Sequence, residues 1–130
     1  MPTLRSHVVI DAAPDAIWRV VSDAPHVADW FPAMTESAGD DTHRTVVLQD
    51  GAILREAVVT ADPQLRRFQY RVVGGDLPVE SHLGTIDVIE LTPQRSIVVY
   101  STEIEPASLA EPFEAAISEA VRALPQILVG

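Results

Sequence analysis

The stretch Val79–Pro106, with the sequence VESHLGTIDVIELTPQRSIVVYSTEIEP, decides the fold that this chain is expected to adopt. Apolar and polar residues alternate along both of its halves, which is typical of two long strands, and Leu91–Arg95 supplies a tight turn between them. One face of this hairpin is mostly apolar and carries His82, Gly84, Ile86, Val88, Val98, Tyr100, Thr102 and Ile104. The histidine and the tyrosine on that face indicate either hydrogen-bonded core positions or the wall of a pocket.

The length and composition indicate one globular domain, residues 1–130. The chain has no cysteine, which excludes a disulfide framework, a thiolate metal site and a cysteine nucleophile. Nine basic residues against 19 acidic ones give a net charge of −10, so nucleic acid is not expected as a partner. The N-terminus lacks the pattern of a signal peptide, and no apolar run is long enough for a membrane span. The sequence therefore predicts a cytoplasmic protein.

Upstream of the hairpin, the pattern changes from strand to helix and back to strand. Thr3–Ile10 alternates as a strand does, and Pro14 then suits the first turn of a helix, where its missing N–H costs nothing. A second short helix is expected at His26–Trp30. The strand-like segments that follow are Met34–Ala38, Thr42–Gln49, Ala52–Thr60 and Arg67–Val73. The pair Asp50-Gly51 is a strong signal for a tight hairpin turn between two of them.

After the hairpin, Ser108–Val129 has the periodicity of an amphipathic helix. Pro125 predicts a bend or an early end in its last turn. The order of elements predicts an α+β fold, in which a curved antiparallel sheet of about seven strands wraps around this one long helix, because the apolar face of the sheet needs a cover. Small residues, Gly84 on the sheet and Ala116 and Ala120 on the helix, leave room for a cavity between the two layers.

Several segments in this order resemble the START-related helix-grip superfamily (SRPBCC), and within it the polyketide cyclase/dehydrase-like group. They are Val8–Trp18 (VVIDAAPDAIW), Arg55-Glu56, Phe68–Val73 (FQYRVV), Leu77–Val79 (LPV) and the hairpin itself. The resemblance covers nearly the whole chain and implies the helix-grip (Bet v 1/START-like) fold. It implies function less narrowly, because the superfamily contains lipid carriers, hormone receptors and aromatase/cyclases.

The segment Val72–Asp76 (VVGGD) also resembles the plant abscisic-acid receptors of the same superfamily. The receptors' pocket acid, pocket aromatic residue, pocket tyrosine, nearby small residue and second pocket acid correspond in this chain to Glu56, Tyr70, His82, Gly84 and Tyr100. The lysine that anchors the hormone carboxylate in those receptors corresponds to about Ala33, so this chain lacks it. An acidic ligand held by a lysine is therefore not expected.

The two-residue period of strands supports the same positions independently. It places Glu56, Tyr70, His82 and Tyr100 on the core-facing side of neighbouring strands, as a polar band. Glu56 and His82 are candidate catalytic residues, since a carboxylate in an apolar cavity has a raised pKa and a histidine titrates near neutrality. Together they would move protons beside a ligand carbonyl. Two alternatives stay open: the pair lines a pocket without catalysis, or one or both belong to a satisfied core or point outward.

The predicted ligand pocket lies between the sheet and the C-terminal helix. Its expected lining is Leu54, Glu56, Val58, Tyr70, Val72, His82, Gly84, Ile86, Tyr100, Phe113, Ala116, Ile117 and Ala120. The remaining histidines are scattered and form no spacing typical of metal ligands, and the chain has no nucleotide-binding glycine motif, so neither a metal nor a cofactor is expected.

The function that the sequence favours is binding of a hydrophobic or aromatic small molecule, lipid or polyketide-like, as START-like proteins do. The alternative is a polyketide aromatase/cyclase or dehydratase, a lyase or isomerase that works without a metal and uses acid/base residues of that pocket. A module that pairs through a sheet edge or helix is a third possibility. The expected state is a monomer or a weak homodimer.

Overall fold

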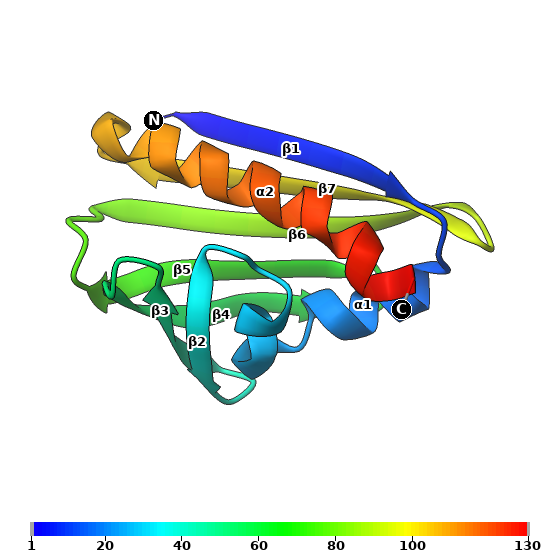
Figure 1. The fold of residues 1–130 in the computed structure, drawn as a ribbon, viewed down its shortest axis with the longest axis horizontal. Helices are drawn as coiled ribbons and strands as arrows, with labels where there is room; N and C mark the ends of the chain where they lie inside the picture. Colours follow the sequence, from blue (N-terminus) through cyan, green and yellow to red (C-terminus); the bar gives the residue numbers. More distant parts are fainter. Residues whose placement is uncertain (1, 130) are drawn as a thin grey trace.

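The computed structural model describes residues 2–129. Within them, seven antiparallel strands form a curved sheet in the order β1-β7-β6-β5-β4-β3-β2 (Figure 1). The strands are β1 (Thr3–Ile10), β2 (Met34–Gly39), β3 (His43–Leu48), β4 (Ile53–Asp62), β5 (Arg67–Gly75), β6 (Ser81–Thr92) and β7 (Arg95–Glu105). Strands that follow one another in sequence are neighbours in the sheet, except β1, which pairs with β7. The predicted fold class is confirmed.

The predicted hairpin consists of β6 and β7, which are 12 and 11 residues long. They pair from Ser81–Glu105 at one end to Thr92–Arg95 at the turn. Alternate residues of the hairpin face the core, because successive side chains of a strand point to opposite sides. His82, Gly84, Ile86 and Val88 on β6, and Val98, Tyr100, Thr102 and Ile104 on β7, are all buried.

The helices lie close to the positions that the sequence predicts. Helix α1 (Pro14–Val21) begins with its proline at the first position, and a 3-10 segment at Ala24–Asp29 takes the place of the predicted second short helix. Helix α2 (Ala110–Val129) follows a 3-10 turn at Ala107–Leu109. Pro125 lies inside α2, and the helix continues to Val129, so the expected early end does not occur.

The core lies between the concave face of the sheet and α2, which packs against β1 and β7 (Figure 1). Completely buried aliphatic side chains such as Ile86, Val98 and Leu124 fill this layer. Burial of one such side chain contributes about 1.5–3 kcal/mol to folding. No helix within residues 2–129 has the length and hydropathy needed to cross a membrane.

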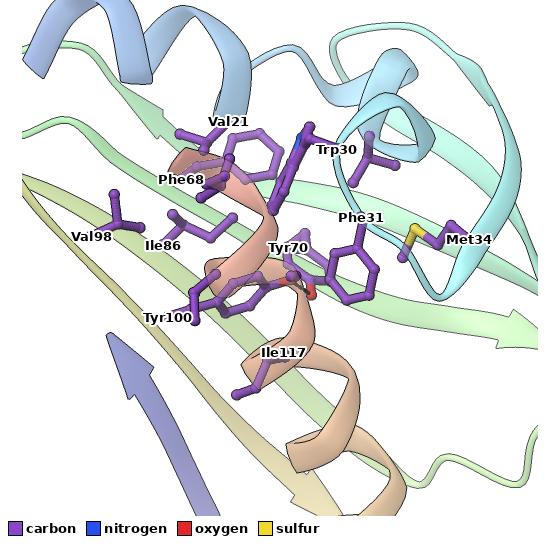
Figure 2. Close-up of a cluster of buried hydrophobic side chains, with 14 of the residues drawn as sticks. Val21, Trp30, Phe31, Met34, Phe68, Tyr70, Ile86, Val98, Tyr100 and Ile117 are labelled. Atoms are coloured by element: carbon purple, nitrogen blue, oxygen red, sulfur yellow. Dashed lines mark hydrogen bonds between the residues drawn. The ribbon is translucent and has the colours of Figure 1, made fainter. Parts of the chain in front are cut away.

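Aromatic side chains dominate the centre of the core (Figure 2). The ring of Tyr100 lies 6.1 Å from that of Phe31 and 6.4 Å from that of Trp30, measured between centroids. Tyr70 lies 6.2 Å from Phe68 on the same strand. Helix α2 covers the β1–β7 side of the sheet. Over β3, β4 and β5 the helix leaves a space, which these rings fill only in part.

Candidate functional site

A cavity of about 370 Å³ opens between the sheet and the first half of α2. Its residues come from the loop before β2 and the first residue of β2, from the end of β3 and the turn after it, from β4, β5, β6 and the β5–β6 loop, and from the 3-10 turn and first half of α2. They are Phe31, Ala33, Met34, Leu48, Gln49, Asp50, Leu54, Glu56, Tyr70, Leu77, His82, Leu109, Pro112, Phe113, Ala116 and Ile117. Most are apolar, and the polar ones within the strands are Glu56, Tyr70 and His82.

A buried ion pair supports one side of the cavity. Arg44 on β3 stands opposite Glu56 on β4 in the strand register. The Arg44 Nε donates a hydrogen bond of 2.7 Å to Glu56 Oε1, and its Nη1 donates one of 3.1 Å to the carbonyl oxygen of Ala24. The guanidinium also lies over the rings of Tyr70 and Phe68, at 4.7 and 5.5 Å from their centroids. These contacts fix the position of the Arg44 guanidinium and hold Glu56 in place.

Burial and the neighbouring arginine shift the pKa of Glu56 in opposite directions. Burial raises the pKa of the Glu56 carboxyl, and the Arg44 guanidinium lowers it in part. The second carboxyl oxygen, Oε2, makes no hydrogen bond to any described residue. The carboxyl group of this cavity-lining residue is therefore held through one oxygen only.

Two tyrosines form a hydrogen-bonded pair next to this ion pair. The hydroxyl groups of Tyr70 and Tyr100 bond to each other, and both side chains are buried. Burial raises the pKa of both phenols well above the usual value, so both are neutral at physiological pH. Tyr70 lies on the cavity wall, whereas Tyr100 lies behind it.

The His82 side chain supplies a hydrogen-bond acceptor where the backbone pairing of β5 with β6 ends. The β5–β6 ladder ends at the pair Tyr70–Gly84. Beyond it, the backbone N–H of Val72 donates a hydrogen bond of 3.0 Å to His82 Nδ1. Since Nδ1 accepts, the proton of the neutral ring is assigned to Nε2. The imidazole lies between the rings of Tyr70 and Phe113, at centroid distances of 5.3 and 5.7 Å.

The surroundings of His82 keep it uncharged. Burial, with smaller contributions from the Arg44 and Arg71 charges, lowers the pKa of His82 to about 4. Nε2 makes no hydrogen bond within residues 2–129. At neutral pH the histidine is therefore a neutral hydrogen-bond donor on the cavity wall.

The cavity brings together part of the predicted pocket. The predicted residues that line it are Leu54, Glu56, Tyr70, His82, Phe113, Ala116 and Ile117. Glu56 and His82 both line the cavity and have separate partners there: Glu56 pairs with Arg44, and His82 accepts from the backbone N–H of Val72.

The structure places the other predicted residues, Val58, Val72, Gly84, Ile86, Tyr100 and Ala120, outside this lining. The ring of Tyr70 covers Gly84 and stands in front of Tyr100. Ile86 and Ala120 are buried further along their elements, in the packed part of the core. Val58 and Val72 keep the inward face that the two-residue alternation predicts, but they are only half-buried and pack against the core away from the cavity wall.

Sequence reasoning missed Arg44, which determines the electrostatics of the site. A signal was present, because Arg44 lies two positions before the buried Val46 on the same strand and therefore shares its inward face. The loop residues Ala33 and Leu77 carried no such signal, since a periodic pattern describes strands and helices only. Within residues 2–129, no group of three or more His, Cys, Asp or Glu side chains is arranged to hold a metal ion.

The family model described as polyketide cyclase / dehydrase and lipid transport matches residues 1–126 of this sequence. The chain belongs to this family. The match confirms the resemblance of the sequence to the polyketide cyclase/dehydrase-like group. No curated protein matches the sequence.

Several solved structures share the fold of this chain at low sequence identity. XoxI from Bacillus cereus is 22% identical, with a TM-score of 0.90 over 99% of this chain and 96% of its own. A START superfamily protein from Mycobacterium smegmatis is 15% identical, with a TM-score of 0.83 over 98% and 97%. Norcoclaurine synthase from Thalictrum flavum, solved in complex with dopamine and hydroxybenzaldehyde, is 21% identical, with a TM-score of 0.77 over 98% and 86%.

Proposed function

We propose that this protein binds a hydrophobic or aromatic small molecule, lipid-like or polyketide-like, in the cavity between the sheet and α2. The observation that carries the proposal is the cavity itself, of about 370 Å³ and with a mostly apolar wall. Cavities of about 300–1,000 Å³ with a few placed polar groups are typical of small-molecule sites. Glu56, Tyr70 and His82 are such groups here.

The comparisons support the same proposal. The description of the family names polyketide cyclases and lipid transport, and both involve largely apolar molecules. Norcoclaurine synthase, which shares the fold, was solved with two small aromatic compounds. A ligand of that general size suits the cavity of this chain. The cytoplasmic location and the oligomeric state stay predictions of the sequence.

A cavity-filling substitution tests the proposal. Native mass spectrometry and calorimetry against a panel of aromatic polyketides and lipids should find a ligand for the unmodified protein. Ala116→Phe fills space at the cavity wall and should abolish that binding. Ala115→Phe is the matched control, because Ala115 is the exposed neighbour on the same helix and its variant should bind normally. Equal binding by both variants, or no ligand in the panel, would contradict the proposal.

A second candidate function is aldol cyclisation or dehydration of a polyketide-like substrate, and the unpaired atoms Glu56 Oε2 and His82 Nε2 favour it. In this role Glu56 would accept the proton α to a ligand carbonyl, and the His82 Nε2–H would donate a hydrogen bond to the carbonyl oxygen. His82 would therefore be the donor and not the base, since Nδ1 already accepts from Val72.

Turnover of a β-polyketone substrate distinguishes the two candidates. Under the enzyme candidate, His82→Phe should lower kcat by about a hundredfold or more, since a donor to a developing oxyanion typically contributes that much. Ligand binding should be retained. If the purified protein binds polyketones and leaves them unchanged, the enzyme candidate fails and the binding proposal stands.

A further inference from the structure

The wall of the cavity carries charged side chains of one sign only. Glu56 lies within it and Asp50 lies at its edge, and no arginine or lysine occurs among its residues. His82 and Tyr70 are the other ionisable groups of the wall, and both are neutral at physiological pH. A carboxylate that entered the cavity would therefore meet no positive charge on its surface.

The buried arginine beside the cavity does not change this. Arg44 is absent from the cavity lining, and its side chain is only 2% exposed. Its Nε is bonded to Glu56, its Nη1 to the Ala24 carbonyl, and its planar face lies over Tyr70 and Phe68. A second anion at Arg44 would have to displace Glu56, which would leave that carboxylate buried without a partner.

From this arrangement we infer that the cavity selects uncharged, hydroxyl-bearing molecules with an apolar body, phenols or alcohols, and rejects the corresponding carboxylates. This inference rests on the proposed binding function and narrows its ligand class. A hydroxyl group both donates and accepts hydrogen bonds. It can therefore donate to Glu56 Oε2 or accept from His82 Nε2–H, whereas a carboxylate only accepts and is repelled by Glu56.

The net charge of the chain acts in the same direction. At −10, the protein as a whole disfavours the approach of anions, an effect that salt weakens. The cost inside the cavity is larger and less sensitive to salt, because an unpaired carboxylate there would lose its hydration without compensation.

Matched pairs of compounds test the inference on the unmodified protein. Calorimetry at pH 7 should compare 2-naphthol with 2-naphthoate, and decan-1-ol with decanoate. We expect the hydroxyl compound of a pair to bind at least about tenfold more tightly than the acid, since the acid would be desolvated without a counter-charge. If an acid binds as tightly as its hydroxyl partner, the inference is overturned while the binding function stands. If no compound of either pair binds, both fail.

A gain-of-charge variant provides a second test that leaves the Arg44–Glu56 pair intact. Ala33 lines the cavity, so Ala33→Lys introduces a cation at its wall. The acids should gain about tenfold or more in affinity, because a charge-assisted bond becomes available, and the hydroxyl compounds should not. Ala33→Met is the control for side-chain length without charge. If the acids gain the same affinity in Ala33→Lys and in Ala33→Met, the inference is overturned.

Discussion

The Arg44 Nε lies 2.7 Å from Glu56 Oε1, and both side chains are almost completely buried beside the cavity. The strand register places these two residues directly opposite each other on β3 and β4. Two charges are thus removed from water together, and each makes the burial of the other tolerable. The same pair also holds the position of Glu56 on the cavity wall, so the stability of the fold and the polarity of the wall depend on the same contact.

Replacing only the arginine should be strongly destabilising. Arg44→Met removes the counter-charge of Glu56 and leaves a buried carboxyl group unpaired. We expect the free energy of unfolding to fall by about 3–5 kcal/mol, the range found when one partner of a buried pair is removed. Urea denaturation followed by circular dichroism measures this change.

A double variant and an exposed pair serve as controls for this prediction. Arg44→Met combined with Glu56→Leu removes both charges and should recover most of the loss. Asp11→Asn breaks the exposed pair of Asp11 with Arg95 and should change the stability little. A double variant as unstable as Arg44→Met alone would show that the arginine acts through packing and not through charge.

Glycine at position 84 makes room for the Tyr70 ring. A Cβ at Gly84 would lie 2.5 Å from Tyr70 Cε1 and 2.6 Å from its Cζ, too close for either atom to remain in place. The ring is buried and bonded to Tyr100, so it cannot move freely. Gly84→Ala should therefore lower the free energy of unfolding by about 1–3 kcal/mol, as overpacking of a core does. Thermal denaturation measures the change.

Gly74→Ala is the matched control for the Gly84 variant. The three atoms nearest to its Cβ would all belong to the guanidinium of Arg55, which is exposed and can move aside. The control should therefore be less destabilised than Gly84→Ala. Equal effects in both variants would mean that the glycines act through strand propensity and not through the tyrosine ring.

The strand order and the covering helix could be predicted from the sequence because both depend on local periodicity. His82 to Val88 alternate as a buried face must, and α2 repeats its apolar residues every three or four positions. Of the two outcomes that Pro125 predicted, a bend or an early end, the early end is wrong, because α2 continues past it to Val129. A proline removes one backbone hydrogen bond, the one from its own nitrogen to the carbonyl four residues earlier, and the residues after it can still continue the helix.

The cavity could be predicted only in part, because alternation gives the face of a residue and not its depth. Glu56 and His82 reach the wall as expected, yet each is already hydrogen-bonded elsewhere. The two register shifts in β4 and the end of the β5–β6 ladder are properties of strand pairing, which the alternation within one strand does not encode. Leu77 and the other loop residues of the wall depend on the path of the chain between strands.

The two tyrosine hydroxyl groups should behave as one unit. Tyr100→Phe removes the partner of Tyr70 and should cost about 1 kcal/mol, as the loss of a single hydrogen bond does. Tyr70→Phe breaks the same bond and should cost a similar amount. The bond can be lost only once. The double variant should therefore lose about as much unfolding free energy as either single variant, and less than the sum of the two losses. Additive losses in denaturation would contradict this coupling.

The stability of the protein should fall in acid because of His82. Its folded-state pKa is about 4, below the value of 6.5 for a free histidine, so between these pH values the unfolded chain binds a proton that the folded chain does not. The contribution of His82 to the free energy of unfolding is therefore fully present above about pH 6.5. It decreases as the pH falls toward 4, by about 3 kcal/mol at most. His82→Gln keeps an acceptor for the Val72 N–H and does not titrate. The difference in unfolding free energy between the two proteins should change with pH across this window, and a constant difference would show that His82 is not the titrating group.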